Sequence, residues 1–474
     1  MTDNCDLLVI GGGPAGVEAA LAGAEAGLRV VLVDEAPAAG GQVYRARPAG
    51  FRGASATPES RDGDRLRARL AASRVVAVFD HAVWSVSPGF RVDALGPAGT
   101  RSWSARSVIA ATGAQERVVP FPGWTEPGVV GLAGATILLK AQHILPGRRT
   151  LVAGCGPLLL AVAAGLLKAG GEVAAVVDLA SPRDWGSRLP NLAVRPDLLA
   201  RGAGWLAKVT RAGVPILSRH ALLRVARRDG GLRAVVGPVD AARRPLAGLE
   251  RSFDVDAVAV GHGLTPSTDV TRLLRAEHLF DPARGGWFAR RDGDGRTSVT
   301  GLSVAGDGGG IAGAAAAALD GRLAGLAAAR DLGALSPEAH EAAAAPLRQQ
   351  SARAHRFGEA MGGLMALRPG QVDAIPQEAI VCRCEDVTRA EIETAMAQGA
   401  TTANQLKAWT RCGMGPCQGR ICGDIAGALL ALATGRHDDV GMFTGRTPFR
   451  PLSLDALAGD CAYADIALPP PAPL

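Results

Sequence analysis

The feature that most constrains the fold of this chain is the segment DLLVIGGGPAGVEAALAGAEAGLRVVLVDE at residues 6–35. It predicts a strand, a glycine turn, a helix and a second strand, with Gly11, Gly13 and Gly16 spaced as GxGxxG and Asp34 closing the second strand. Gly11 permits the sharp turn, Gly13 lets the backbone approach a pyrophosphate, and Gly16 lets helix and strand pack closely. Asp34 can accept hydrogen bonds from a ribose. The segment therefore predicts a dinucleotide site at the N-terminus of the helix.

A second segment repeats this plan. Residues 149–178, RTLVAGCGPLLLAVAAGLLKAGGEVAAVVD, predict another strand, glycine turn, helix and strand, with Gly154 and Gly156 in the turn. The position of the third glycine is Leu159, whose bulky side chain stands where helix and strand should approach closely. Three alternatives stay open for this loop: NAD(P), another adenine nucleotide, or a scaffold without a ligand. The repeat predicts an α/β fold.

Length and composition narrow the class of protein. At 474 residues the chain has room for roughly two to four domains. The net charge of +6 comes from scattered basic residues and aromatics are only 4%, so no nucleic-acid partner is expected. The N-terminus has no signal-peptide pattern, and Lys168 and Glu172 interrupt the most apolar run, so no transmembrane segment is expected. We expect a cytoplasmic protein.

Two further segments bear on which dinucleotide is bound. SVIAATGAQERVVPFPG ends a strand at Thr112 and Gly113, and VTGLSVAGDGGGIAGAAAAALDGRLAG ends another at Gly306 and Asp307, before an Ala-rich helix. With AGGQVYR, they resemble segments of the two-dinucleotide-binding-domain flavoproteins related to thioredoxin reductase and glutathione reductase, over most of residues 1–335. The resemblance implies a pyridine nucleotide-disulfide oxidoreductase-like fold and FAD, with Asp307 bonded to the ribitol.

The same resemblance implies a set of cofactor-binding residues. The related reductases bind NAD(P)H at the second loop, so Gly154 and Gly156 are the candidate residues for binding a second nucleotide. The implied FAD-binding residues are Gly11, Gly13, Pro14, Ala15, Gly16, Asp34, Glu35, Gly41, Gln42, Thr112, Gly113, Gly306, Asp307 and Ala312.

Disulfide chemistry is not expected at this flavin. The disulfide-reducing relatives carry a cysteine pair beside it, whereas no pair lies between Cys5 and Cys382. The isolated Cys155 is expected to fill space. A lone histidine in a loop, His262, is expected to be structural, and the sequence identifies no catalytic residue.

Five of the eight cysteines, Cys382, Cys384, Cys412, Cys417 and Cys422, gather in the last quarter of the chain. Clustered thiols in a reducing compartment favour metal binding over disulfides. Thiolates hold zinc or iron–sulfur clusters, and the single residue between Cys382 and Cys384 suits a cluster better than the CxxC loop of a zinc site. An iron–sulfur cluster is the leading interpretation, with zinc or a metal-free relic as alternatives.

Short helices are predicted around these thiols. Thr388 and Glu391 form a capping-box pattern that opens a helix ending at Gly399. Another helix is expected near residues 403–410, and a third from Pro416, a favourable first helical position.

The cysteine segment resembles the bacterioferritin-associated-ferredoxin-like domain, which binds a two-iron two-sulfur (2Fe–2S) cluster through CxC and a later cysteine pair. The resemblance implies Cys382, Cys384, Cys412 and Cys417 as ligands. Four residues separate Cys412 from Cys417, where the small ferredoxin has two. Cys422 is expected to pack on a helix, and whether it serves as a ligand stays open.

The whole chain, with this order of segments, resembles the alpha or A subunits of heteromeric amine-oxidising dehydrogenases, a group that includes opine oxidase, D-hydroxyproline dehydrogenase and the B subunit of hydrogen cyanide synthase. The family implies amine oxidation on a separate D-amino-acid-oxidase-like flavoprotein subunit, together with a further partner, a small ferredoxin-like subunit. This chain would relay the electrons through FAD and the cluster. The alternative is a self-contained NAD(P)H-dependent flavin or ferredoxin reductase.

The expected domain boundaries follow from these segments. They are an FAD-binding domain in two parts (1–120 and 251–345), an inserted NAD(P)-binding-like domain (121–250), a linker (346–375), the 2Fe–2S domain (376–440) and a C-terminal tail (441–474).

Overall fold

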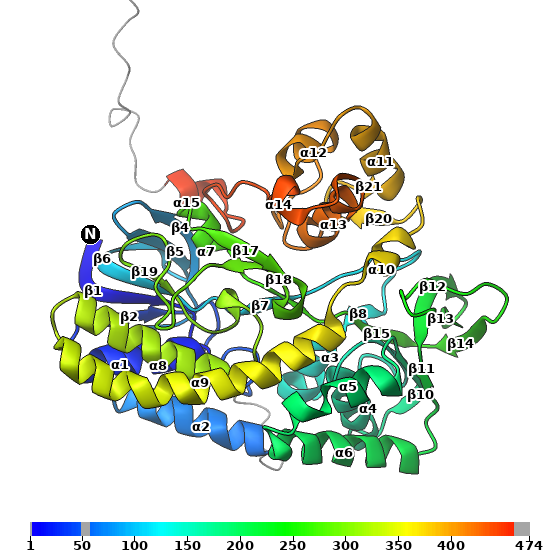
Figure 1. Ribbon diagram of the computed structural model, residues 1–474, viewed down its shortest axis with the longest axis horizontal. Helices are drawn as coiled ribbons and strands as arrows, with labels where there is room; N and C mark the ends of the chain where they lie inside the picture. The colour runs from blue at the N-terminus through cyan, green and yellow to red at the C-terminus, as the bar shows by residue number, and fades with distance from the viewer. Residues whose placement is uncertain (1, 49–56, 459–474) are drawn as a thin grey trace, which may run out of the picture.

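A computed structural model describes residues 2–48 and 57–458 of the chain (Figure 1). The last part of the expected tail, residues 459–474, lies outside the described residues. The chain forms a first domain around the N-terminal sheet, an inserted domain around a second sheet, and a small helical module drawn in orange in Figure 1. The long yellow helix α9 runs from the first domain to the inserted one.

A seven-stranded sheet forms the first domain. Its order is β3-β2-β1-β6-β5-β4, and β19 also pairs with β6. Parallel pairing of β1 with β2 and β6, and of β19 with β6, brings their carboxyl ends to one edge, where ligands bind in such sheets. The elements are β1 (Thr2–Ile10), α1 (Pro14–Glu25), β2 (Val30–Val33), α2 (Pro58–Ala71), β3 (Val76–Val78), β4 (Ala82–Ser87), β5 (Arg91–Gly96), β6 (Gly99–Ala110), α7 (Asp269–Leu273), β17 (His278–Asp281), β18 (Gly286–Ala289), β19 (Leu302–Val304) and α8 (Ala314–Asp331).

Helices α1 and α8 pack closely because small residues line their contact. A Cβ atom built at Gly321 would lie 2.0 Å from the carbonyl oxygen of Ala15, and one at Gly325 would lie 2.3 Å from that of Ala19. Gly306, just before α8, would likewise meet the Ala15 side chain at 2.9 Å. The Ala- and Gly-rich sequence therefore holds the N-terminal ends of both helices near each other.

A five-stranded parallel sheet, in the order β11-β10-β9-β15-β8, forms the inserted domain, with an antiparallel sheet β12-β13-β14 beside it. Because β15 pairs with β9, this domain continues to Gly261, beyond the expected boundary at residue 250. The chain then returns through β16 (Leu264–Pro266), which pairs with β7 (Ala114–Glu116). The elements are β8 (Val129–Gly131), α3 (Leu132–Ile137), β9 (Arg149–Gly154), α4 (Leu158–Lys168), β10 (Glu172–Asp178), α5 (Pro182–Leu192), α6 (Pro196–Arg211), β11 (Ile216–Ser218), β12 (His220–Arg228), β13 (Gly231–Pro238), β14 (Arg251–Val255) and β15 (Ala257–Gly261).

The connection to the cysteine module is helical for most of its length. Helix α9 (Pro337–Met365) occupies much of the expected linker, and Ser336 caps its N-terminus. Ser351 donates to the buried Asp320 of α8 at 2.8 Å, and His355 lies 3.1 Å from the same carboxylate. These buried contacts, which the composition of the segment does not reveal, hold α9 against the first domain.

The cysteine module is a compact unit with its own buried core. The predicted capping box is confirmed, because Thr388 and Glu391 each accept from the other's backbone N–H group. The helix predicted from Pro416 begins only at Gly423, since Gln418 (φ 50°) and Gly419 (φ 81°) adopt left-handed conformations. The elements are α10 (Pro369–Asp373), β20 (Ile380–Cys382), β21 (Val387–Thr388), α11 (Arg389–Ala397), α12 (Ala403–Thr410), α13 (Gly423–Thr434), α14 (His437–Val440) and, after the module, α15 (Leu454–Ala458).

Two ion pairs dock the module on the first domain. Arg117, which is 4% exposed, pairs with Asp424 at 2.7 Å. Arg420 pairs with Asp269 of α7 at 2.9 Å. The module is thus fixed by charged contacts as well as by its covalent connection.

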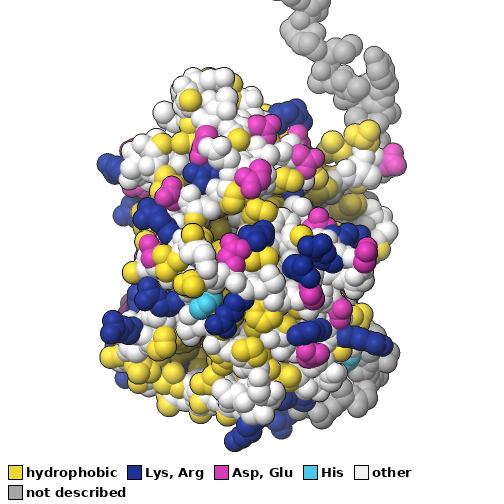
Figure 2. Space-filling model, turned by 90° about the vertical axis from the view of Figure 1, so that its right-hand side faces the viewer, with side chains coloured by type: hydrophobic (Ala, Val, Ile, Leu, Met, Phe, Trp, Pro, Cys, Tyr) yellow, Lys and Arg dark blue, Asp and Glu magenta, His cyan; other side chains and the backbone are white. Residues whose placement is uncertain are grey.

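On the face shown in Figure 2, Lys and Arg side chains are interspersed with Asp and Glu, and no extended surface of one charge is visible. Among the helices of the described residues, none combines the length and apolar character required to cross a membrane.

Candidate functional site

The first glycine loop has the geometry that the motif predicts. Gly11 has φ +106°, and a Cβ there would lie 2.4 Å from the carbonyl oxygen of Ala111. A Cβ at Gly16 would lie 1.7 Å from the Gly11 carbonyl oxygen, and Gly41 packs on Gly13 so closely that its Cβ would lie 2.9 Å from the Gly13 Cα. Side chains are therefore excluded around the N-terminus of α1, where free backbone N–H groups favour a phosphate.

The carboxylate of Asp34 lies beside this loop, at the end of β2. It accepts hydrogen bonds from the backbone N–H groups of Gly12 and, at 2.6 Å, of Ala36. Burial raises the pKa of Asp34, and the two N–H groups oppose that rise. Its neighbour Glu35 is instead largely exposed and pairs with Arg450 at 3.0 Å. Of the two acids named from the sequence, only Asp34 contacts the glycine loop.

The remaining predicted residues of the first domain divide into two groups. Gln42 is exposed, and its amide oxygen accepts from Arg45 at 2.9 Å. Thr112 donates its hydroxyl to the Ser267 carbonyl oxygen at 3.0 Å, and the Gly113 carbonyl oxygen accepts from the Ser267 N–H group at 2.9 Å. Thr112 and Gly113 thus join the end of β6 to the segment that returns from the inserted domain.

Asp307 orients the turn that leads into α8. Its Oδ1 accepts from the backbone N–H groups of Ala312 at 3.0 Å and Gly313 at 3.2 Å. Burial raises the pKa of Asp307. Within the described residues, its Oδ2 has no hydrogen-bond donor and is available to a ligand. Two helix N-termini and two carboxylates therefore meet near one edge of the sheet, and this donor set fits a dinucleotide.

The second glycine loop is covered by another part of the chain. A Cβ at Gly154 would lie 1.8 Å from the Gly261 carbonyl oxygen, so the tight turn itself is present. A Cβ at Gly156, however, would lie 2.6 Å from the Sδ atom of Met365, the last residue of α9. Leu159, in the third glycine position, is buried in the core of the inserted domain. The loop keeps its backbone shape while Met365 packs over it.

Three cysteines meet in the core of the cysteine module. The Sγ atoms of Cys382, Cys412 and Cys422 all lie within 4.8 Å of one another, and the three residues are buried. The neighbouring thiols of Cys412 and Cys422 lower the pKa of Cys382, whereas the proximity of Cys382 raises the pKa values of Cys412 and Cys422. Such a group of soft donors fits zinc or an iron–sulfur cluster.

Cys384 and Cys417 lie beside each other at the less buried side of this group. Burial raises the pKa of Cys384; the backbone N–H group of Cys417 opposes that rise, and the thiol of Cys417 adds to it. A Cβ at Gly415 would lie 2.2 Å from the Cys384 Cβ, so the backbone approaches this pair closely. All five clustered cysteines thus converge. Cys422, whose role as a ligand was open from the sequence, belongs to the central three.

A short series of contacts joins the cysteine module to the loop before α8. Asp424, two residues after Cys422, approaches Gly286, where a Cβ would lie 3.1 Å from its Oδ1. At the adjacent Gly285, a Cβ would lie 2.6 Å from Cγ1 of Ile311. Ile311 precedes the residue whose N–H group binds Asp307. The module therefore packs directly against the first dinucleotide domain.

Residues 5–321 match the sequence model of the pyridine nucleotide-disulphide oxidoreductases, and residues 377–460 match that of the sarcosine oxidase A3 domain. The C-terminal match supports a defined domain in that region, and its likeness to a ferredoxin stays a prediction.

Similar proteins cover nearly the whole chain. The A subunit of opine oxidase from Agrobacterium tumefaciens is 35% identical over 97% of this chain and 92% of its own length. Hydrogen cyanide synthase subunit HcnB of Pseudomonas protegens is 32% identical over 95% of this chain and 96% of its own. The crystal structure of L-proline dehydrogenase from P. horikoshii has the same fold, with a TM-score of 0.66 and 20% identity over 97% of this chain and 81% of that one.

These matches confirm the expected flavoprotein fold and the resemblance to the A subunits of opine oxidases. The chain is an oxidoreductase that belongs to the pyridine nucleotide-disulphide oxidoreductase family, and within it to the group of proteins that includes the A subunit of opine oxidase and hydrogen cyanide synthase subunit HcnB.

Proposed function

We propose that this chain is the electron-transferring FAD and iron–sulfur subunit of a heteromeric dehydrogenase or oxidase. The substrate would be an amine or amino acid of the opine, D-hydroxyproline, proline or glycine type. The observation that carries the proposal is the direct packing of a five-cysteine module against a dinucleotide cradle, through the Arg117–Asp424 pair. The names of the similar proteins describe them as subunits, which supports a function within a complex.

The first glycine loop would hold FAD. The backbone N–H groups at the N-terminus of α1 would bind its phosphates, Asp34 its adenosine ribose, and the free oxygen of Asp307 its ribitol. Bound FAD supplies the ability to accept an electron pair and release electrons singly. The crowded glycines Gly11, Gly16 and Gly41 keep side chains out of the space that the cofactor needs.

The cysteine module would hold a 2Fe–2S cluster, which carries single electrons. Cys382, Cys384, Cys412 and Cys417 are the predicted ligands, and the burial of Cys422 with Cys382 and Cys412 makes it the competing fourth ligand. Holding such a cluster requires all four ligands as thiolates.

The partner would be a D-amino-acid-oxidase-like flavoprotein that carries the substrate pocket, and a small ferredoxin-like subunit would be a further partner, in the cytoplasm. The competing function, a self-contained NAD(P)H-dependent reductase, requires nicotinamide at the second glycine loop. Met365 packs on Gly156 there, and the buried Leu159 occupies the position of the third glycine of the motif. Both features favour the role in a complex over the reductase.

The test is purification of the chain alone and together with the product of its neighbouring gene. Each preparation is assayed with opines, D-hydroxyproline, proline and glycine, using a dye as electron acceptor. We expect substrate-dependent dye reduction only in the joint preparation. An isolated chain that oxidises one of these compounds at the full rate would contradict the proposal.

A further inference from the structure

The proposed function leaves the second glycine loop unused, although its backbone keeps a nucleotide-binding form. The φ angles of Gly154 and Gly156 are +132° and +96°, and the tight turn on the Gly261 carbonyl oxygen is present. Asp178 ends β10 at the position of the ribose-binding acid. Leu159, in the place of the third glycine, is buried in the core of the inserted domain, away from the edge of the sheet where ligands bind.

The side chain of Met365 lies at the carboxyl ends of β9 and β10. Cβ atoms built at Gly156 and Gly263 would lie 2.6 Å from its Sδ atom and 3.0 Å from its Cβ atom, so it stands between these two glycines. It also packs against a small cluster that contains Cys155 and Leu179, the residues that follow β9 and β10. Such strand ends receive the pyrophosphate of a dinucleotide, so Met365 takes the place of the ligand.

The acid of the motif is engaged by the chain itself as well. Oδ2 of Asp178 accepts from Nε1 of Trp185 at 3.3 Å, and Oδ1 accepts from the backbone N–H group of Ala180 at 2.9 Å. Burial raises the pKa of Asp178 to about 6, and these two hydrogen bonds oppose that rise. Trp185 and Met365 pack against the same apolar cluster, to which α5 and α9 both contribute. The two helices therefore close the ligand edge of the inserted domain together.

Two buried arginines hold the C-terminal end of α9 in this position. Arg243, which is 2% exposed, donates from Nη2 to the carbonyl oxygen of Leu364 at 2.7 Å and from Nη1 to that of Ala366 at 3.2 Å. Nη1 of Arg117 donates to the carbonyl oxygen of Met365 at 3.4 Å. Three successive carbonyl groups thus receive cationic donors, an arrangement that stabilises the C-terminal end of a helix.

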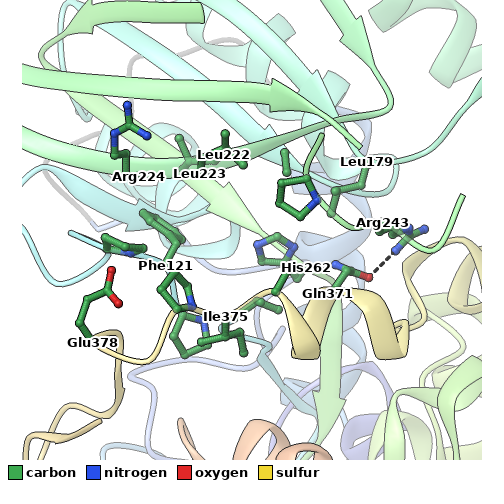
Figure 3. A pocket seen from close by; sticks show the side chains of 17 residues that line it. Phe121, Leu179, Leu222, Leu223, Arg224, Arg243, His262, Gln371, Ile375 and Glu378 are labelled. Atoms are coloured by element: carbon green, nitrogen blue, oxygen red, sulfur yellow. Dashed lines mark hydrogen bonds between the residues drawn. The ribbon is translucent and has the colours of Figure 1, made fainter. Parts of the chain in front are cut away.

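Helix α10 holds one of these arginines in turn. Nη1 of Arg243 also donates to Oε1 of Gln371 at 2.9 Å, a bond that Figure 3 marks with a dashed line. A cavity of about 330 Å³ borders both residues (Figure 3). The cavity gives this part of the chain space to move when the hydrogen bonds to the end of α9 are broken.

The preceding turns of α9 are fixed to the first domain. A Cβ at Gly362 would lie 1.8 Å from the carbonyl oxygen of Ala283, and one at Gly358 would lie 2.5 Å from the Cα atom of Ala312. Ala312 in turn donates its N–H group to Asp307. The same helix therefore contacts the turn of the first dinucleotide site and the second glycine loop.

We infer that the C-terminal end of α9 is an autoinhibitory plug: Met365 occupies the second nucleotide site, Arg243 and Arg117 hold it there, and the loop binds an adenine nucleotide once the plug is withdrawn. A glycine turn between two strands, with an acid at the end of the second strand, recognises the adenosine diphosphate part of such a ligand. The plug lies outside the proposed electron relay, because it concerns only the inserted domain and α9.

The test is equilibrium dialysis of the purified full-length chain, with its flavin, against radiolabelled ADP. Met365→Ala removes the plug and keeps a good helix former. Met361→Ala is the matched control, because it removes the same side chain one turn earlier, where Met361 is buried but does not approach Gly156. Arg243→Met breaks the hydrogen bonds to the end of α9 and leaves Met365 in place. The double variant Met365→Ala, Gly156→Ala puts a methyl group back into the opened space.

ADP should bind saturably to Met365→Ala and to Arg243→Met. Binding to the wild type and to Met361→Ala should be at least about tenfold weaker, because a site that is open for a small fraction of the time loses affinity in proportion. The double variant should lose the gain. Equal binding by the wild type and Met365→Ala, or no binding by either Met365→Ala or Arg243→Met, would overturn the inference.

Hydrogen exchange of the wild-type chain gives a second measurement that needs no variant. The backbone amide of Gly156 should exchange slowly beneath Met365, and exchange as fast as at the exposed Gly230 would also overturn the inference. Flavin content and the thermal midpoint show whether each variant is folded. A failure of the proposed electron relay would appear in the flavin and iron content and would leave the ADP result unchanged.

Discussion

At the scale of single residues, the proposed function depends on a few side chains that can bind a cofactor or a metal. Asp307 uses one carboxylate oxygen to hold the turn before α8 and keeps the other for a ligand. Cys382 contacts both Cys412 and Cys422 in the core of the module. Each of these residues can be changed with little disturbance of the backbone, so each gives a direct test of the site to which it belongs.

Asp307→Asn should reduce the flavin content of the purified protein. Asparagine keeps an oxygen for the N–H groups of Ala312 and Gly313 but loses the negative charge and turns the free oxygen into a donor. Loss of one charge-assisted hydrogen bond weakens binding by about tenfold or more. The measurement is the ratio of flavin to protein absorbance after gel filtration, with the exposed Asp229→Asn as the control. An unchanged ratio would remove Asp307 from the cofactor site.

Cys382→Ser should abolish the visible absorption of the cluster and most of the bound iron, while the flavin stays in place. A serine hydroxyl is a poor substitute for a thiolate ligand. Cys155→Ser is the matched control, because this cysteine is also buried but stands apart from the others. Iron analysis and absorbance spectra measure the outcome, and full iron content in Cys382→Ser would refute the ligand assignment. The same analysis of Cys417→Ser and Cys422→Ser decides which of them completes the set.

At the scale of helices and strands, the C-terminal end of α9 and the docking of α13 distinguish this chain from a simple two-nucleotide reductase. Helix α9 brings Met365 over the second glycine loop. The first turn of α13 carries Asp424, which pairs with the buried Arg117. Helix α9 thus covers the second glycine loop, and helix α13 anchors the cysteine module to the first domain.

Because Met365 covers the second loop, NADH and NADPH should leave the flavin oxidised. The experiment adds each nucleotide to the purified chain without oxygen and follows the flavin absorbance. Dithionite, which needs no binding site, should bleach the same sample and serves as the positive control. Rapid bleaching by either nucleotide would favour the self-contained reductase.

Asp424→Asn should loosen the cysteine module. Removing one partner of a buried ion pair leaves an uncompensated charge and costs about 3 kcal/mol. The side chains of Arg117 and Asp424 are 3% and 17% exposed, so solvent replaces little of the lost interaction. We expect a lower thermal midpoint and faster proteolytic cleavage between α10 and β20. Asp254→Asn breaks an exposed pair with Arg233 and should change neither quantity; equal behaviour of the two variants would contradict the docking role.

The elements that could be predicted from the sequence are those whose causes are local. Helix α12 ends where its pattern indicated, and the Thr388–Glu391 capping box formed because both partners lie within one turn. The predicted start of α13 at Pro416 was wrong. Phe443, from a later segment, packs against Gly419, where a Cβ would lie 2.5 Å from the Phe443 ring. The packing of Met365 over the second glycine loop and the position of Cys422 among the buried cysteines likewise depend on contacts between distant parts of the chain.

At the scale of the whole molecule, the order of the domains explains the proposed division of labour. The first domain offers a dinucleotide cradle, and in the inserted domain Met365 packs over the second glycine loop. The cysteine module packs beside the cradle through Asp424 and Gly286. The chain as a whole therefore has parts suited to taking up and passing on electrons, and the proposal assigns the substrate pocket to a partner.

The most direct test of this account is electron paramagnetic resonance of the joint preparation, frozen after an opine is added without oxygen. We predict the signal of a reduced 2Fe–2S cluster in the complex with the partner flavoprotein, and no signal when the same compound is added to this chain alone or to a complex that contains Cys382→Ser. A cluster signal from the isolated chain, or its absence from a complex that oxidises the opine at the full rate, would contradict the account.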